Sequence, residues 1–297
     1  MRILVAHNWQ YHNSRPVDNY ALSMIRELRN QGHEVIPTLK TPPTAREVYK
    51  YIDLLLDIDC GRNDKGELRW HGEVEKPDCP SAVYFIDSHG YPSLHRRLAK
   101  NYDHVFFAVW DKRDLFAKHP SAHWCPNFTD LEWFDVDAHS PKTPFDFGFY
   151  GSKGGLDRAN PLIKIANDNG WIADVQQIGA GGRHRWPETA ASMAQCKVLF
   201  NHGQKHDGPN LRVMESMAMK RPLISDQDPR SGMDKLFEPG VHYIPYEAYT
   251  YNHLEERMRW SLENPDKAKL IALHAYDEVK EKHLVKNRID QILKTIK

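Results

Sequence analysis

The sequence lacks any apolar run of the roughly 20 residues that are needed to span a bilayer. It also lacks a net charge, because 40 Lys and Arg residues balance 40 Asp and Glu residues. We therefore expect no membrane span and no overall field that attracts a polyanion. The apolar start, MRILVA, has no small-residue cleavage pattern, so it predicts a first β-strand rather than a signal peptide. A cytoplasmic location is the expectation.

Metal-binding and disulfide patterns are also missing. The four cysteines, Cys60, Cys79, Cys125 and Cys196, lie far apart without CxxC spacing, which indicates reduced thiols rather than a zinc site or a disulfide framework. No DxD pair lies in a position suited to a metal-held diphosphate. Asp57-x-Asp59 has the spacing but follows an expected strand in the N-terminal half. We expect no metal ligand and no tightly bound cofactor.

Strands and helices alternate in two separate stretches of the sequence. The length of 297 residues allows two domains. Buried strands are expected at 2–6, 33–37, 52–58, 82–86 and 104–109, and again at 145–150, 171–178, 197–201 and 223–225. Helices are expected at 16–29 and 112–117, then at 158–169, 188–194, 209–219 and from 247 to the end. The polar segment Phe134–Phe145 has two prolines and predicts a linker. The pattern predicts α/β domains with doubly wound parallel sheets at 1–140 and 141–280.

The most informative segment is HDGPNLRVMESMAMKRPLISD, from His206 to Asp226. Gly208 and Pro209 predict a turn into a helix. The first-turn N–H groups at Asn210, Leu211 and Arg212 would bind a phosphate, because free donors and the helix dipole both favour an anion. Glu215 lies in the second turn, where its carboxylate could accept hydrogen bonds from a ribose diol. Asp207, eight residues before it, could meet sugar hydroxyls.

This segment resembles the donor-binding signature of retaining GT-B glycosyltransferases: an acid, seven residues, Glu, a small-residue helix, then a strand. Asp207 stands at the first acidic position, where Glu is more common, and Glu215 at the second. Lys220 replaces a usual glycine. The sequence is most similar to the glycosyltransferase-like group related to spore-maturation and spore-coat proteins. The resemblance implies two Rossmann-like domains that face across a cleft, with 281–297 as a C-terminal helix packing back on the N-terminal domain.

A glycine-rich loop, GSKGG, follows the expected strand 145–150. Glycine at position 151 would let the backbone approach a ligand closely, and Ser152 is expected to bind the donor in the same loop. Lys153 and Arg158 could neutralise the diphosphate leaving group, which gains negative charge as the sugar–phosphate bond breaks. The loop lacks the GK[ST] ending of a Walker motif. A flexible surface loop with solvated cations is the alternative.

Two loops of the N-terminal half follow expected strands and so lie at the ligand-binding edge of a parallel sheet. Asp87 and His89 could orient the donor sugar or the acceptor hydroxyl, or assist proton transfer. Local hydrogen bonding within the loop is the alternative for both. Trp9, Tyr11 and Arg15 could stack on a planar or sugar-like acceptor.

We therefore expect a glycosyltransferase that moves a sugar from a nucleoside-diphosphate sugar, UDP-linked by default, to an acceptor hydroxyl with retention. The nucleotide sugar would be a co-substrate rather than a resident cofactor. The acceptor stays open among a small molecule, a glycan, a protein and DNA that carries a hydroxymethylated base. Two other functions of the same fold also stay open: a sugar-nucleotide epimerase or hydrolase, and a non-catalytic sugar-nucleotide binder.

Overall fold

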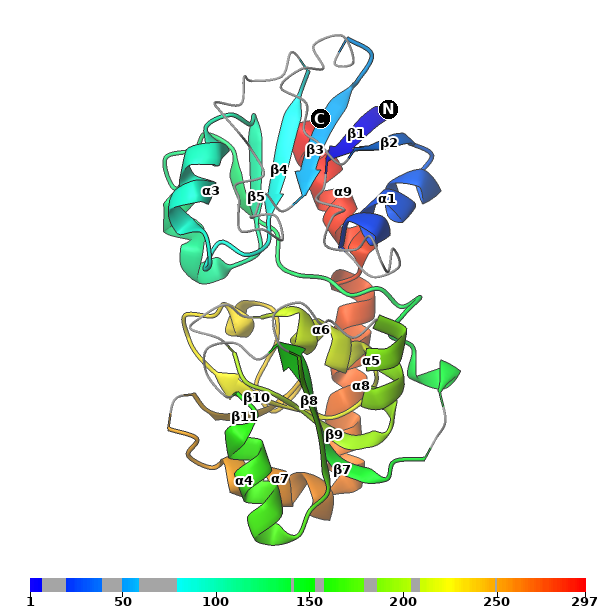
Figure 1. The fold of residues 1–297 in the computed structure, drawn as a ribbon, viewed down its shortest axis with the longest axis vertical. Helices are drawn as coiled ribbons and strands as arrows, with labels where there is room; N and C mark the ends of the chain where they lie inside the picture. The colour runs from blue at the N-terminus through cyan, green and yellow to red at the C-terminus, as the bar shows by residue number, and fades with distance from the viewer. Residues whose placement is uncertain are drawn as a thin grey trace. The chain divides into compact units, whose positions relative to one another are not determined.

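A computed structural model describes residues 1–6, 20–38, 50–58, 79–139, 142–152, 158–178, 186–203, 209–248 and 250–297 (Figure 1). The chain forms two compact units. Unit 1 comprises Met1–Pro126 and Val285–Lys297, and unit 2 comprises Asn127–Leu284. The chain thus passes between the units after residues 126 and 284, whereas the sequence pattern predicted boundaries after 140 and 280.

Unit 1 is built on a parallel sheet whose described strands have the order β2-β1-β3-β4-β5-β6. These strands are β1 (Arg2–Ala6), β2 (Glu34–Thr38), β3 (Leu54–Ile58), β4 (Ser81–Phe85), β5 (His104–Phe107) and β6 (Ala122–Trp124). Every residue of β3 and β4 is buried, as expected for strands that are covered on both faces. The apolar run in each therefore specifies a central strand of the sheet.

The helices of unit 1 include segments from both ends of the chain. They are α1 (Tyr20–Asn30), α3 (Pro92–Ala99), the 3₁₀ helix η2 (Trp110–Phe116) and α9 (Val285–Ile296). Leu98 of α3 and Phe116 of η2 pack on the face of the sheet that carries Leu4 and Val83. The C-terminal helix α9 packs beside α1, and Nε2 of Gln31, just after α1, donates to Oδ1 of Asp290 at 2.9 Å (Figure 1).

Unit 2 contains a second parallel sheet, whose described strands have the order β11-β10-β9-β7-β8. The strands are β7 (Phe145–Ser152), β8 (Ala173–Ile178), β9 (Cys196–Asn201), β10 (Leu223–Gln227) and β11 (Ile244–Glu247). Its helices are α4 (Asn160–Asn169), α5 (Trp186–Ala194), α6 (Leu211–Ala218), α7 (Leu254–Glu263) and α8 (Pro265–Lys282), with short 3₁₀ helices η3 (Val136–Ala138) and η4 (Met233–Lys235).

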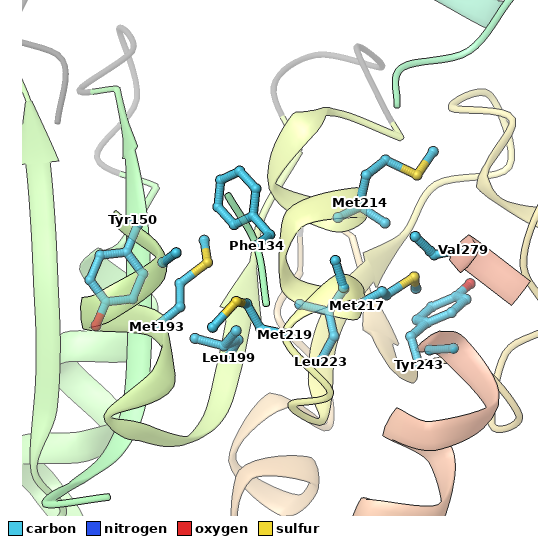
Figure 2. Packing of buried hydrophobic residues seen from close by; sticks show 14 of the residues in the cluster. Phe134, Tyr150, Met193, Leu199, Met214, Met217, Met219, Leu223, Tyr243 and Val279 are labelled. Atoms are coloured by element: carbon cyan, nitrogen blue, oxygen red, sulfur yellow. The ribbon is translucent and has the colours of Figure 1, made fainter. Parts of the chain in front are cut away.

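Two apolar layers cover the sheet of unit 2. One layer joins α5, α6 and α8 to the sheet, and Figure 2 shows Met214 and Met217 of α6 among Leu223, Tyr243 and Val279. The other layer joins α4 and α7 to the opposite face through Phe149 and Phe200. Because α6 is packed along its length, the start of this helix has a fixed position at the edge of the sheet.

Several expected elements differ from the structure. The prediction of helix from residue 247 onward is wrong, because Glu247 ends β11 and α7 begins only at Leu254. The helix expected at 209–219 begins at Leu211, and the helix expected at 112–117 is the 3₁₀ helix η2. Strand β6 and helix α3 were not expected. These elements are short, so little of the apolar periodicity that marks longer ones is present.

Candidate functional site

The order of the strands in unit 2 reverses between β7 and β9. The chain leaves β7 toward β8 on one side and returns to β9 on the other. In open parallel sheets, ligands bind outside the carboxyl ends of the strands at such a reversal. Strand β7 ends at Ser152 and β9 at Asn201, and α6 follows β9. These three features define the candidate site of unit 2.

The start of α6 lies at this reversal. Asn210 is the N-cap residue, with an extended backbone, and its side chain does not cap the helix. The residue before it is fixed, because Nδ2 of Asn127 donates to the carbonyl of Pro209 at 3.0 Å. The amides of Asn210 and Leu211 precede the first intrahelical hydrogen bonds, so they are available to an anion together with the positive end of the helix dipole. This geometry is compatible with the phosphate-binding role of the helix start, which stays a prediction.

Glu215 lies one turn beyond Leu211 on α6 and is only 7% exposed. The alternative that this residue is a solvated helix charge is therefore excluded by its burial. A buried carboxylate is stable only where it is hydrogen-bonded or paired. Its position, one turn below a helix start that suits a phosphate, is compatible with the ribose-binding role that the sequence predicts.

The guanidinium of Arg212 lies directly against Gly151 at the reversal. Nε of Arg212 donates to the carbonyl oxygen of Tyr150 at 2.5 Å, and Nη1 donates to Oδ1 of Asn201 at 2.8 Å. The guanidinium also lies over the ring of Phe149, 4.3 Å from its centroid. A Cβ atom at Gly151 would collide with this guanidinium. Both residues were predicted to bind the donor, and the structure places them in contact with each other.

Asn201 connects three elements and was missed by the sequence analysis. Its Oδ1 accepts from Arg212 and from Nδ2 of Asn210 at 3.1 Å, both in the segment that begins α6. Its Nδ2 donates to Oγ of Ser225 at 2.9 Å and contacts Oδ1 of Asp226 at 3.4 Å, both in β10. The signal was present in the sequence, because Asn201 is a polar residue that ends a buried strand.

His202, the next residue, is buried and uncharged at neutral pH. Burial and the nearby cations Arg158 and Arg212 lower its pKa to about 4. Its Nδ1 lies 2.8 Å from the hydroxyl of Tyr246 and 3.8 Å from Asp226, whose oxygens already accept from the amide of Gly203 at 2.9 and 3.0 Å. Since Asp226 is engaged elsewhere, burial and the two cations outweigh its attraction for a proton on His202. Arg158, another predicted donor contact, thus lies near the reversal and is buried.

In unit 1, Asp87 and His89 lie in a turn that follows β4, and both are half-buried. The amide of Gly90 donates to the carbonyl of Asp87 at 2.9 Å and closes the turn. Between them, Ser88 is fully buried, and its Oγ lies 3.1 Å from Nδ1 of His95 on α3. Burial, with a smaller effect of His89, lowers the pKa of His95 to about 3. A neutral Ser88–His95 pair therefore fixes the turn.

Six of the predicted site residues lie outside the described residues: Trp9, Tyr11, Arg15, Lys153, Asp207 and Gly208. Ser152 ends β7, paired with Ile178 in β8. Asp57 of the spaced pair Asp57-x-Asp59 is buried and accepts from the hydroxyl of Tyr102 at 2.6 Å. Within the described ranges, no three His, Cys, Asp or Glu side chains gather to hold a metal ion, and Cys79, Cys125 and Cys196 are free thiols.

The sequence of the chain matches the family described as "Glycosyl transferase-like" over residues 138–294, which are 157 of the 297 residues. The chain belongs to the glycosyl transferase-like family. The match includes nearly all of unit 2, with β7, β9 and α6. It confirms that the protein is of the glycosyltransferase class, as the sequence analysis predicted. No curated protein matches the chain.

Solved glycosyltransferase structures share the fold across both units. Sucrose-phosphate synthase from Thermosynechococcus elongatus has a TM-score of 0.65 at 11% identity, over 99% of this chain and 98% of that one. HepE from Anabaena, in complex with UDP-glucose, has a TM-score of 0.65 at 12% identity, over 100% and 99%. An alpha-glucosyltransferase in complex with UDP and a 13-mer DNA containing an HMU base has a TM-score of 0.61 at 10% identity, over 100% and 99%.

These similarities confirm the predicted fold, in which this glycosyl transferase-like protein has two parallel α/β domains of the GT-B type. None of the described helices is long and apolar enough to cross a membrane.

Proposed function

We propose that this protein transfers a sugar from a UDP-sugar to an acceptor hydroxyl, with retention at the anomeric carbon. The observation that carries the proposal is the placement of a buried carboxylate, Glu215, one turn beyond a helix start at the reversal of a parallel sheet. A helix start favours the diphosphate, and a carboxylate at this distance along the helix favours the ribose.

The proposed contacts with the donor follow from that placement. The amides of Asn210 and Leu211, together with Lys153 and Arg158, would hold the diphosphate. They would stabilise the negative charge that develops on the leaving group as the bond to the sugar breaks. Glu215 would accept hydrogen bonds from the ribose hydroxyls.

Asp207 and His89 would contact the sugar. Asp87 is the second polar side chain of the His89 turn and would orient the acceptor hydroxyl. The proton of that hydroxyl would pass to the leaving phosphate, which lies on the same face of the sugar in a retaining reaction. Trp9, Tyr11 and Arg15 would contact the acceptor through stacking.

The choice of UDP is supported by the HepE structures, which are complexes with UDP-glucose and with UDP. The alpha-glucosyltransferase structure, which contains DNA with an HMU base, favours a modified DNA base as one candidate acceptor. The zero net charge of the chain opposes a DNA acceptor. Salt separates these possibilities, because DNA binding weakens steeply as salt rises and binding of a small neutral acceptor does not.

The first test is the thermal unfolding of wild type and Glu215→Ala with UDP and UDP-glucose. A ligand at a hundred times its Kd stabilises the folded protein by about 2.7 kcal/mol. We expect this stabilisation in wild type and its loss in Glu215→Ala. Glu263→Ala, which changes an exposed glutamate of α7, is the matched control and should respond as wild type does.

Absence of a shift with every nucleotide would contradict the proposal. Turnover then separates the related functions. Release of UDP without any acceptor indicates a hydrolase or epimerase, and binding without turnover indicates a sugar-nucleotide binder.

A further inference from the structure

Arg212 is held in one orientation by three neighbours. It is the second residue of α6 and is 7% exposed. Its Nε donates to a backbone carbonyl of β7 and its Nη1 to the side chain of Asn201 in β9, while the flat face of the guanidinium lies over Phe149. The planar fork of arginine suits this arrangement, since two donors that point in different directions are fixed in one rigid group. The side chain therefore ties α6 to both strand ends that flank the reversal.

Gly151 provides the space for this guanidinium. A Cβ at position 151 would collide with Nη2 and would lie 2.8 Å from Cζ and 3.1 Å from Nε. The end of a long side chain can usually move away from such a clash. Here, movement would break the hydrogen bonds to Tyr150 and Asn201 and would separate the cation from the Phe149 ring. The glycine is thus matched to the arginine, although the two residues lie 61 positions apart in the sequence.

The orientation of Arg212 also fixes two amide side chains. A guanidinium has donors only, so Asn201 must present its oxygen to Arg212. The amide nitrogen of Asn201 then faces Ser225 and Asp226. Asn210 must in turn present its nitrogen to the same oxygen of Asn201. The oxygen of Asn210, at the N-cap of α6, is left buried and without a hydrogen-bond partner in the part of the chain that the structure describes.

We propose that Arg212 is a positioning residue of the nucleotide site. We propose further that position 151 is glycine because a side chain there would collide with the Arg212 guanidinium. In this assignment neither residue binds the donor directly. Arg212 fixes the first turn of α6 and turns the unpaired oxygen of Asn210 toward a ligand group that can donate a hydrogen bond, such as a sugar hydroxyl. The inference rests on the proposed function, because the nucleotide site is the one assigned there.

The test is a double-mutant cycle on UDP affinity, measured by calorimetry at a temperature where all variants are folded. Loss of one hydrogen bond to a charged group corresponds to a change of about tenfold in binding affinity. We expect Gly151→Ala and Arg212→Ala each to weaken UDP binding by about tenfold or more. In the background of Arg212→Ala, the change Gly151→Ala should have little further effect, because its clash partner is gone.

Two further variants separate positioning from charge and from general stability. Arg212→Lys keeps the positive charge but cannot form both hydrogen bonds, so it should bind UDP no better than Arg212→Ala. Gly148→Ala lies in the same strand, and its Cβ would meet the side chains of Cys196 at 2.5 Å, Tyr150 at 2.9 Å and Leu199 at 3.1 Å instead of Arg212. It should lower stability without a matching change in UDP affinity, and its effect should add to that of Arg212→Ala.

The outcomes are distinct. If wild type does not bind UDP, the proposed function fails, and the same cycle measured by urea unfolding of the unliganded protein still tests the Gly151–Arg212 match. Additive effects of Gly151→Ala and Arg212→Ala in both measurements would overturn the inference. Wild-type UDP affinity in Arg212→Lys would also overturn it, since charge alone would then account for the role of Arg212.

Discussion

The two units hold their ligand-side edges in different ways. In unit 2, charged side chains connect the strand ends, with Arg212 donating to β7 and β9 and Asp226 accepting from Gly203. In unit 1, the turn after β4 is held by the neutral pair Ser88 and His95. Both arrangements fix a loop at the carboxyl edge of a parallel sheet, and the units differ in whether charge is used to do so.

This difference suits the two proposed tasks. In unit 2, Arg212 fixes the start of α6, where free amides and the helix dipole favour an anionic diphosphate. In unit 1, the neutral Ser88–His95 pair adds no charge next to Asp87 and His89, which are half-buried in the same turn.

The largest expected effect is a loss of stability in acid, and it tests whether the buried histidines of the two units are equivalent. The folded pKa of His202 is about 4 and that of His95 about 3, both below the ordinary value of 6.5. Below pH 6.5 the unfolded chain therefore binds protons that the folded chain does not, so stability falls as the pH falls toward these folded values. Each histidine should contribute a loss of about 3 kcal/mol by pH 4.

Urea unfolding between pH 7 and pH 4 measures this loss. Removing one titrating group with His202→Asn or His95→Asn should make the stability of the protein less dependent on pH. His274→Asn, which changes an exposed histidine of α8, is the matched control. If His202→Asn keeps the wild-type slope while His95→Asn does not, the Asp226 carboxylate pairs with a charged His202 and the two units differ more than we infer.

A smaller effect is expected from Asn201→Asp, which tests whether the contacts that join Arg212 to Asp226 require an uncharged side chain at position 201. The new carboxylate still accepts from Arg212, but it loses the donor to Ser225 and places a second negative charge next to Asp226. We expect a loss of about 2 kcal/mol in unfolding free energy and weaker UDP binding. Asn160→Asp, at the exposed start of α4, is the matched control and should change stability by less than about 0.5 kcal/mol. Equal effects of the two variants would contradict the role of Asn201.

The sequence predicted the central strands of both sheets, because apolar runs such as Leu54–Ile58 are buried on both faces. It did not predict β11, where Pro245 interrupts the apolar pattern of an edge strand. The start of a helix near Asn210 could be predicted because it depends on a local turn, and the donor-binding roles of this helix start and of Glu215 stay predictions. The contact between Arg212 and Gly151 could not be predicted, because it depends on how β7 and α6 come together in the folded sheet.

The smallest effect tests whether the geometry of the nucleotide site depends on the start of α6 alone or on both ends of this helix. Lys220, just past the far end of α6, replaces the usual glycine of the resembling family and has a left-handed backbone with φ of 51°. Its Nζ contacts Asp137 at 2.6 Å, but Asp137 is 73% exposed, so this pair adds little. Because a side chain in this conformation costs about 1 kcal/mol, Lys220→Gly should be more stable than Lys220→Ala by about that amount. Denaturant unfolding measures the difference, and UDP affinity should be the same in both variants. A change in UDP affinity would mean that both ends of the helix, and not its first turn alone, set the geometry of the nucleotide site.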